Sequence, residues 1–541
     1  MNKLKCKICG GQIEMQGDDK GVCLNCGTAY SLESMKKMLD GVKVSMTGSS
    51  EDVAQWRQLL NRYYSAGDFS GVERITKKIL EAAPSDQQAN LIYDELQIYK
   101  YLDIKNGVLE GYTGTARKII IPNIITRIAA GTFANNPYVE EVILPDNLVA
   151  IEASLFENCV NLKRVHLPAS LTTICDKAFN GCVSLENVEI PESVNCIGEY
   201  AFSSCEKLSE FTIPKGITRI EKSTFKGCNG LKSIHIPDGV DSVGEYAFAD
   251  CTNLEEINMP DSIRSIAKYA FSDCGGLKRV SVADGVESVG ESAFANCTNI
   301  EEINMPDSVR RIGKDVFFGC EKLSDFVVPR GVICIVGYTF RGCSGLKCVH
   351  IPNGVRYIEG EAFADCCSLE SVSIPPSVKK IGEVDESVTG DWDYRYGTHG
   401  GAFENCRALK EVNFSEGLEI LGDNTFLNCI SLKTIELPDG LKHIGAKAFK
   451  NCTSLQKLAI PHSVITTTGM WLLDSERYKG YPWMGCSALE DIKYPYRFSL
   501  SIFEGTKFYN EKKRLEKGIC PKCNVRLSVF NRRCPKCKKK F

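Results

Sequence analysis

The sequence of 541 residues contains 43% hydrophobic and 25% charged residues, and its formal net charge is −3. This composition is typical of an ordinary soluble protein with enough apolar residues for a large core. No stretch reaches the roughly 18 apolar residues of a membrane span, and the first residues lack the apolar run of a secretory signal. We therefore expect a cytoplasmic protein.

Residues 1–40 contain two cysteine pairs, Cys6-Lys-Ile-Cys9 and Cys23-Leu-Asn-Cys26. Each pair can direct two thiolates at one ion, and two pairs complete a tetrahedral site for Zn²⁺. Four thiolates leave no open coordination position, so the pattern indicates a structural rather than a catalytic ion. The segment resembles a zinc ribbon.

Residues 41–50 are rich in Gly, Ser and Thr and read as a flexible linker to a helical domain at 51–105. Apolar residues then recur at helical spacing, and a third helix is expected at about 86–101. The placement of Trp56, Leu59, Tyr63, Phe69 and Pro84 resembles one tetratricopeptide hairpin. The segment departs from that pattern at Leu60 and Val72, where small residues are expected. It could cap the domain that follows, or it could form a peptide groove.

From about Ile119 to Pro495, one short sequence pattern occurs fifteen times. An aromatic residue begins each copy, with Cys three residues later in fourteen copies, Leu or Ile after six and usually Pro after twelve. Eleven copies are spaced by 23 residues, and a fixed period of this length predicts a solenoid. The aromatic residues are Phe133, Phe156, Phe179, Phe202, Phe225, Phe248, Phe271, Phe294, Phe317, Phe340, Phe363, Phe403, Phe426, Phe449 and Trp483.

Within one copy, Val165 and Leu167 alternate with polar residues, as in a half-buried strand, and Pro168 ends the strand because it has no N–H. A second apolar pair, such as Val194 and Ile197, follows before the next aromatic residue. One copy is too small to bury its own apolar face, so the copies must stack. At the usual spacing between strands, fifteen turns give a rod of roughly 70 Å.

The motif Ala178-Phe179-x-x-Cys182-x-x-Leu185-x-x-Val188-x-Ile190-Pro191 resembles the BspA-like leucine-rich repeats. The resemblance covers residues 106–496 apart from two insertions. It implies a right-handed solenoid with one long sheet, no enzymatic activity and a role in protein binding. Many members of that family are secreted or surface-attached, and the expected cytoplasmic location departs from them.

The 27 cysteines divide into eight in the terminal CxxC pairs, fourteen in the repeat column and five others. Column cysteines on adjacent turns could lie about 5 Å apart, within the range of a disulfide. The interpretation we favour is a column of reduced thiols, because Cys is a small buried residue with a weak S–H donor. Reduced thiols also fit a reducing compartment.

A block of five turns occurs twice, 115 residues apart. Glu206-Lys-Leu-Ser-Glu-Phe211 returns as Glu321-Lys-Leu-Ser-Asp-Phe326, and Leu231-Lys-Ser-Ile-His235 returns as Leu346-Lys-Cys-Val-His350. A scaffold can tolerate such a change in length, whereas an enzyme built around a fixed site rarely can. The outward strand positions carry charges that alternate in sign between turns, which favours ion pairs across strands.

Seventeen residues are inserted near 383–401 and eleven near 468–482, both at the same point of the repeat. Aromatic side chains in loops on a rigid support are typical of binding hot spots, although they could instead fold back onto neighbouring turns. The candidate partner-binding residues are Trp392, Tyr394, Tyr396, Trp471, Tyr478 and Tyr481.

After a linker at 497–517, residues 518–541 contain Cys520-Pro-Lys-Cys523 and Cys534-Pro-Lys-Cys537. This spacing predicts a second structural zinc ribbon and a total of two Zn²⁺ ions. Residues 512–541 hold twelve Lys or Arg and one acidic residue, so they could bind nucleic acid or an acidic partner.

The sequence contains no phosphate-binding glycine loop, no GxSxG motif and no HExxH motif, and its six histidines are scattered. We expect a non-enzymatic scaffold for an unidentified protein partner, with no small-molecule substrate. Two alternatives remain open: a nucleic-acid-associated protein that uses the ribbons and the basic tail, and a BspA-like surface adhesin exported without a signal peptide.

Overall fold

The computed structural model describes residues 13–15, 20–23, 29–31, 50–65, 69–90, 92–93, 100–383, 400–467, 482–495, 503, 506–516, 519, 521 and 536–537. They fall into two compact units, Met1–Asp103 with Tyr112–Gly114, and Ile104–Gly111 with Thr115–Phe541. None of the helices in these ranges is both long and apolar enough to cross a membrane.

The first unit contains a small antiparallel sheet and two helices. The sheet has the order β1-β2-β3, with β1 at Ile13–Met15, β2 at Lys20–Cys23 and β3 at Ala29–Ser31. The helices are α2, Ser50–Ser65, and α3, Phe69–Ala82, and residues 87–90 and 92–93 are also helical. Their shared core consists of Trp56, Leu60, Val72, Ile75, Ile79 and Ala89.

Leu60 and Val72 are fully buried, so the two positions that depart from the tetratricopeptide pattern carry core residues here. Asp86 is buried beside them and accepts hydrogen bonds from the Arg57 guanidinium and from the Ala89 main-chain N–H. Burial raises the pKa of the Asp86 carboxyl, but these hydrogen bonds and the Arg57 charge outweigh it, so the pKa is lowered. Asp86 thus links α2 to the helical turn that begins at residue 87.

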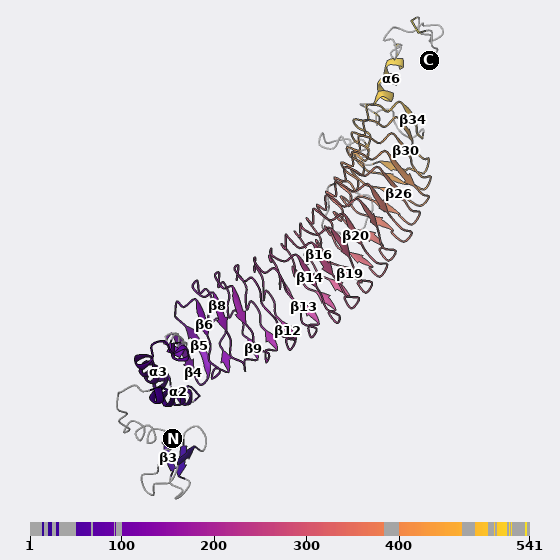
Figure 1. Cartoon of the computed structure of the whole chain (residues 1–541). Helices are drawn as coiled ribbons and strands as arrows, with labels where there is room; N and C mark the ends of the chain where they lie inside the picture. The colour runs from indigo at the N-terminus through magenta and orange to yellow at the C-terminus, as the bar shows by residue number, and fades with distance from the viewer. Residues whose placement is uncertain are drawn as a thin grey trace, which may run out of the picture. The chain divides into compact units, whose positions relative to one another are not determined.

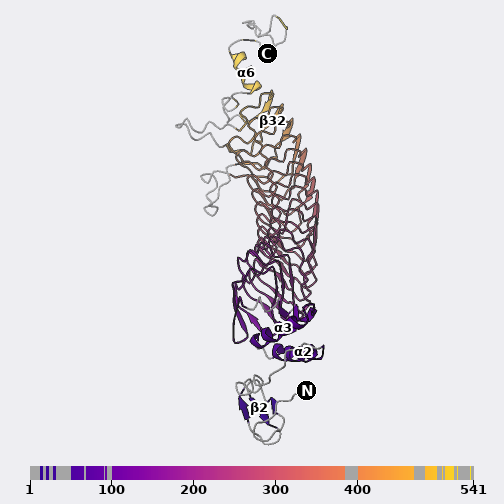
Figure 2. The ribbon, with the colours of Figure 1, turned by 60° about the vertical axis from the view of Figure 1, so that its left-hand side comes forward.

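The second unit is a β-solenoid of about fifteen turns with a period of about 23 residues (Figure 1). Figure 2 shows the same stacked turns from another side. Each turn contributes residues to two ladders of short parallel strands. This differs from the one long sheet that the family resemblance implied. The second ladder forms because the chain is also extended at the last residue of the second apolar pair of each copy, as in Ser242–Val243, where Val243 is buried.

The first ladder alternates exposed and buried residues, in agreement with the pattern predicted around Val165. Its strands are β6 Lys118–Ile120, β8 Glu141–Ile143, β10 Arg164–His166, β14 Ser233–His235, β16 Glu256–Asn258, β18 Arg279–Ser281, β20 Glu302–Asn304, β22 Asp325–Val327, β24 Cys348–His350, β26 Ser371–Ile374, β28 Glu411–Phe414, β30 Thr434–Glu436, β32 Lys457–Ala459 and β34 Asp491–Lys493. Single-residue bridges continue it through Asn187 and Glu210.

The second ladder starts with β4, Leu102–Lys105, and β5, Val108–Tyr112, in one sheet with β7. Its strands are β7 Arg127–Ile128, β9 Ala150–Ile151, β11 Thr173–Ile174, β12 Cys196–Ile197, β13 Arg219–Ile220, β15 Ser242–Val243, β17 Ser265–Ile266, β19 Ser288–Val289, β21 Arg311–Ile312, β23 Cys334–Ile335, β25 Tyr357–Ile358, β27 Lys380–Ile381, β29 Ile420–Leu421, β31 His443–Ile444 and β33 Thr466–Thr467.

The repeat phenylalanines form a continuous stack through the core. From Phe133 to Phe449 the ring centroids of successive turns lie 5.1 to 6.2 Å apart, with nearly parallel planes. Trp483 ends the series, and the buried Phe503 stacks on it at 5.2 Å. Helix α6, Lys507–Glu516, follows, with Phe508 against Phe503 at 5.8 Å. These residues cover the last turn, as a terminal cap must in a solenoid.

The column cysteines are hydrogen-bond donors between turns. Each of the fourteen S–H groups donates to the main-chain carbonyl oxygen of the aromatic residue in the preceding turn, at 3.0 to 3.3 Å. Burial raises the pKa of the column thiols from Cys159 to Cys452, for example to about 12 for Cys159 and Cys251. All fourteen are buried and free, as the interpretation of a reduced thiol column predicted.

Candidate functional site

Both insertions begin at the same edge of one sheet. Strands β23, β25, β27, β29, β31 and β33 form a parallel six-stranded sheet in this order. The first insertion follows β27 and the second follows β33, so three strand spacings, or about 14 Å, separate their starting points. Two loops that are far apart in sequence therefore leave the solenoid close together in space.

The insertion aromatics Trp392, Tyr394, Tyr396, Trp471, Tyr478 and Tyr481 lie outside the described residues, so their placement stays a prediction. The same holds for the zinc-ribbon cysteines Cys6, Cys9, Cys26, Cys520, Cys523 and Cys534. Two members of the predicted ribbons are described: Cys23 is the last residue of β2, and Cys537 lies in a turn.

The outer surface of the second ladder is basic where the first insertion begins. We define the basic face as Arg310, Arg311, Arg356, Lys379 and Lys380, which come from β21, β25, β27 and the residues just before them. Lys379 reaches Glu419 at 3.9 Å. The other four cations form no ion pair with any residue that the structure describes.

The first ladder differs because several of its outward charges form ion pairs between turns. Lys163 pairs with Glu140 at 2.9 Å, Lys278 with Glu255 at 2.8 Å and, across the first insertion, Lys410 with Glu370 at 2.8 Å. These contacts confirm the prediction that alternating charges favour ion pairs between turns. Within the described residues, four of the five cations of the basic face have no ion-pair partner, which distinguishes this face from the paired surface of the first ladder.

Two large apolar side chains lie within the basic face. Ile333 immediately precedes β23 and is 58% exposed, and Tyr357 begins β25 and is 45% exposed. The main-chain N–H of Tyr357 donates to the carbonyl oxygen of Ile333, so the two residues lie on adjacent turns. Exposed apolar side chains surrounded by charge are common in protein-binding surfaces.

Charged and aromatic side chains also cluster at the corner of the solenoid from which the first insertion leaves. Arg341 contacts Glu361 at 2.5 Å and Asp365 at 3.6 Å, and its guanidinium carbon lies 5.4 Å from the Tyr338 ring centroid. Lys314 Nζ lies 4.5 Å from the same ring. Burial raises the pKa of the Tyr338 hydroxyl, and the Glu361 carboxylate raises it further. The Tyr338 ring therefore lies within reach of two cations, Lys314 and Arg341.

Two half-buried acids complete this corner. Burial raises the pKa of Asp315, and the neighbouring Lys314 charge only partly offsets the effect. Burial also raises the pKa of Glu404, which accepts a hydrogen bond from the Gly401 N–H at 3.1 Å. A Cβ on Gly401 would collide with the Asn424 main chain, so glycine is required where the first insertion rejoins the solenoid.

The basic face was not predicted from the sequence, where only the charges of the first-ladder column, such as Lys278, were compared between copies. When the copies are aligned at their second-ladder strands, Arg310–Arg311, Arg356–Tyr357 and Lys379–Lys380 fall into the same two columns. The sequence therefore contains the signal, but only side-chain distances show that four of these cations have no ion-pair partner among the described residues.

Comparison with known proteins agrees with the architecture. The family described as "BspA type Leucine rich repeat region (6 copies)" matches residues 103–232, 220–335, 311–384 and 399–475, which together span well over half of the chain. A search of curated proteins finds no match.

Among solved structures, a leucine-rich repeat protein from Bacteroides ovatus is 24% identical with a TM-score of 0.55, and the match covers 74% of this chain and 94% of that one. A leucine rich cell surface protein from Faecalibacterium prausnitzii is 27% identical with a TM-score of 0.38, covering 75% of this chain and 94% of that one. The first of these likenesses supports the fold, and the extended family match supports the assignment: the chain belongs to the BspA-type leucine-rich repeat family.

Proposed function

We propose that the chain is a non-enzymatic scaffold that binds an acidic segment of a protein partner along the basic face, with the two insertion loops as additional anchors. The observation that carries this proposal is the position of the uncompensated cations. Arg356 immediately precedes β25 and Lys380 is the first residue of β27, and the first insertion follows β27. A charged surface steers an oppositely charged partner, and aromatic side chains beside it supply affinity.

The partner chemistry follows from the mixture of side chains on this face. Arginine and lysine favour carboxylates, and the exposed Ile333 and Tyr357 favour apolar or aromatic side chains between them. An acidic protein segment with interspersed apolar residues offers both. The aromatic residues of the insertions, Trp392 and Trp471 among them, would then contact the partner beside the basic face.

The first test compares capture of partners from a cell extract by the intact chain and by an Arg356→Asp, Lys380→Ser double variant. These substitutions introduce the residues found 115 positions earlier, Asp241 and Ser265, which the fold already tolerates. We expect the double variant to lose a protein that the intact chain retains. The matched control Arg264→Asp changes a cation in the corresponding column of the first block and should keep that protein.

The alternative of nucleic-acid binding is an outcome of the same experiment. If the captured material is DNA or RNA, falls steeply with salt and is lost when residues 512–541 are deleted, the scaffold proposal is wrong. The function would then belong to the basic tail, and the solenoid would serve as a spacer.

A second test concerns the insertions. Trp392→Ala and Trp471→Ala should each weaken binding of the captured partner by about 2 kcal/mol, the magnitude of an interface hot spot, without changing the melting temperature. A large fall in melting temperature with unchanged affinity would instead mean that the two tryptophans pack against neighbouring turns.

We also propose that the terminal CxxC pairs hold two structural Zn²⁺ ions. In support, the four cysteines at each end supply a complete thiolate set, and Cys23 ends a strand of a small antiparallel sheet. Protein purified gently should contain about two zinc ions, and Cys23→Ser should remove one of them. A metal content near zero in the intact chain would contradict this proposal.

A cytoplasmic location is proposed on the same chemical grounds, since fourteen thiols that act as hydrogen-bond donors suit a reducing compartment. Cell fractionation tests it. Recovery of the protein outside the cell would favour the adhesin alternative.

A further inference from the structure

Three metal-binding side chains converge on the outer surface of the first ladder. Cys348 and His350 are the first and third residues of β24, so they project from the same face of one strand. Asp325 is the register partner of Cys348 on the neighbouring strand β22. One donor atom from each residue lies within 4.8 Å of the other two.

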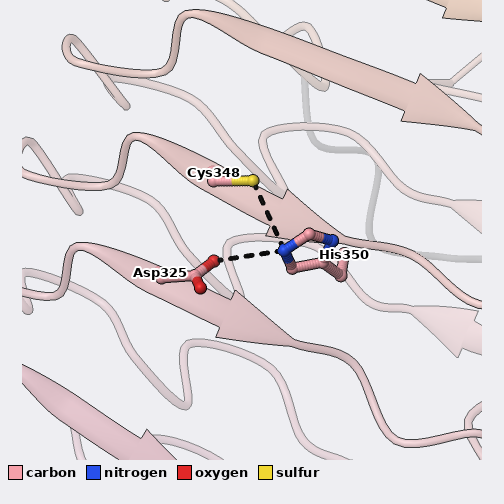
Figure 3. Close-up of side chains that lie close together, drawn as sticks. All are labelled: Asp325, Cys348 and His350. Atoms are coloured by element: carbon pink, nitrogen blue, oxygen red, sulfur yellow. Dashed lines mark hydrogen bonds and ion pairs between the residues drawn. The ribbon is translucent and has the colours of Figure 1, made fainter.

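Figure 3 shows both interactions meeting at one ring nitrogen of His350. The Cys348 Sγ lies 3.6 Å from His350 Nε2, and Asp325 Oδ1 lies 3.8 Å from the same nitrogen. In a tetrahedral Zn²⁺ site, ordinary Zn–S and Zn–N bond lengths place sulfur and nitrogen ligands about 3.6 Å apart. The separation of these two donors therefore already suits one ion, and the exposed Asp325 carboxylate, within 4.8 Å of both, can close on the same ion by adjusting its side chain.

We propose that Asp325, Cys348 and His350 bind a borderline or soft divalent cation such as Zn²⁺ through one thiolate, one imidazole and one carboxylate. Three protein ligands leave at least one coordination position for water. Hard ions such as Mg²⁺ prefer oxygen ligands in octahedral geometry, so the donor set selects against them.

The surroundings keep these donors available. The side chains of Asp325 and His350 are 57% and 61% exposed, so an ion can reach them from solvent. Val327, the register partner of His350, is 61% exposed and offers its ring no hydrogen bond. Among the described residues, no further side chain is hydrogen-bonded to the three donor atoms.

The first copy of the five-turn block is a natural comparison. The corresponding residues there are Glu210, Ser233 and His235, so the histidine is present but the thiol is not. His235 instead has the Asn258 amide nitrogen 3.3 Å from its Nδ1. The proposed site thus belongs to the second copy alone, and the first copy supplies matched control positions.

The test uses the full chain and measures the alkylation rate of each cysteine by peptide mass spectrometry, with and without Zn²⁺. A zinc-bound thiolate is protected from alkylation, so Zn²⁺ should slow the reaction of Cys348 by about tenfold or more. The exposed thiols Cys196 and Cys367 should react at unchanged rates, and Mg²⁺ should protect none of the three. This readout is specific to Cys348 and therefore independent of zinc in the terminal ribbons.

Two variants decide whether the cluster holds the ion. His350→Gln and Asp325→Asn should each reduce the zinc protection of Cys348, whereas His235→Gln in the first copy should leave it intact. The proposal is overturned if Zn²⁺ fails to slow alkylation of Cys348, if it slows Cys196 and Cys367 equally, or if protection survives in both variants.

Discussion

The two copies of the five-turn block, which begin at Phe202 and Phe317, have the same core and different surfaces. Phe248 stacks on its neighbours at 5.3 Å on both sides, and the corresponding Phe363 does so at 5.1 Å on both sides. The outer face of the second ladder has changed: Asp241 and Ser242 of the first copy correspond to Arg356 and Tyr357 of the second.

At the corner of the solenoid an ion pair is kept in both copies although a neighbouring position changes from Tyr246 to Glu361. In the first copy Lys226 pairs with Asp250 at 3.7 Å and lies 5.1 Å from the Tyr246 ring. In the second, Arg341 pairs with Asp365 at 3.6 Å. Each turn needs only its buried columns to stack on the next, so outward residues can change without loss of the fold. The second copy, which also carries the first insertion, is therefore where we locate the specialised surfaces.

The largest expected effect tests whether the two cores are equivalent. Phe248→Ala and Phe363→Ala each remove a fully buried ring from the stack and should cost about 3–5 kcal/mol in the free energy of unfolding. Denaturant unfolding of the two variants should give similar losses. A much smaller loss at Phe363 would mean that the insertion has loosened the core of the second copy.

His443 provides a second test because it differs from its counterpart in the first copy. Arg311 is exposed, whereas His443 is buried, and burial lowers the pKa of His443 from 6.5 to about 4. Between these values the unfolded chain gains a proton that the folded chain does not, so stability falls as the pH falls from 6.5 to about 4. The expected loss is about 3 kcal/mol over this window.

The control for that prediction is His443→Gln, which cannot titrate. Unfolding measured across the same pH range should lose this part of its pH dependence in the variant. If the wild type and the variant have the same pH profile, the imidazole of His443 titrates normally.

The thiol column should behave alike in both copies. Cys274→Ala and Cys406→Ala each remove a buried S–H that donates to a main-chain carbonyl, at 3.0 and 3.2 Å respectively. We expect each to lower the free energy of unfolding by about 1–2 kcal/mol, from a small cavity and a lost weak hydrogen bond. Cys367→Ala, at an exposed position, should have almost no effect on the denaturation midpoint.

The smallest effect concerns Glu404, whose counterpart in the first copy is Ser272. The raised pKa of Glu404 means that its contribution to stability is complete below its ordinary pKa of 4.5 and is lost as the pH rises through the folded value. Glu404→Gln should therefore stabilise the protein slightly at neutral pH, by less than about 1 kcal/mol because water still reaches the carboxyl. Below about pH 4, which is below the ordinary pKa of a glutamate, wild-type Glu404 is protonated. Thermal unfolding measured there should show no gain in stability for the variant. A gain that persists in acid would come from packing rather than charge.

Features that recur in every copy of the repeat could be predicted from the sequence. The spacing of Phe156 and Cys159 is repeated so often that the stack, the buried thiols and the paired charges of the first ladder were predictable from register alone. The cluster at His350 was not predicted, because no other histidine lies in the same column on an adjacent turn. Its partners are a cysteine on the same strand and an aspartate on the next, and the register of the first ladder would have revealed them.

Other features could not be predicted because they depend on side-chain distances. The position that His443 occupies is exposed or half-buried in the other turns whose burial is described, so the repeat pattern gives no sign of its burial. The rise in the pKa of Asp315 and of Glu404 likewise reflects local shielding at the corner beside the first insertion. The same holds for Arg310, Arg311, Arg356 and Lys380, which form no ion pair with any described residue, since opposite charges nearby in sequence do not guarantee contact.

The thiol column has a practical consequence for measuring the dynamics of the solenoid. Each turn from Cys159 to Cys486 carries one buried thiol that can react with an alkylating reagent only when that turn opens. The modification rate of each cysteine therefore reports the opening equilibrium of its own turn. The protein carries an internal set of probes, one per turn, from which fraying at the ends, loosening beside the insertions and cooperative unfolding of neighbouring turns could be mapped without introducing any label.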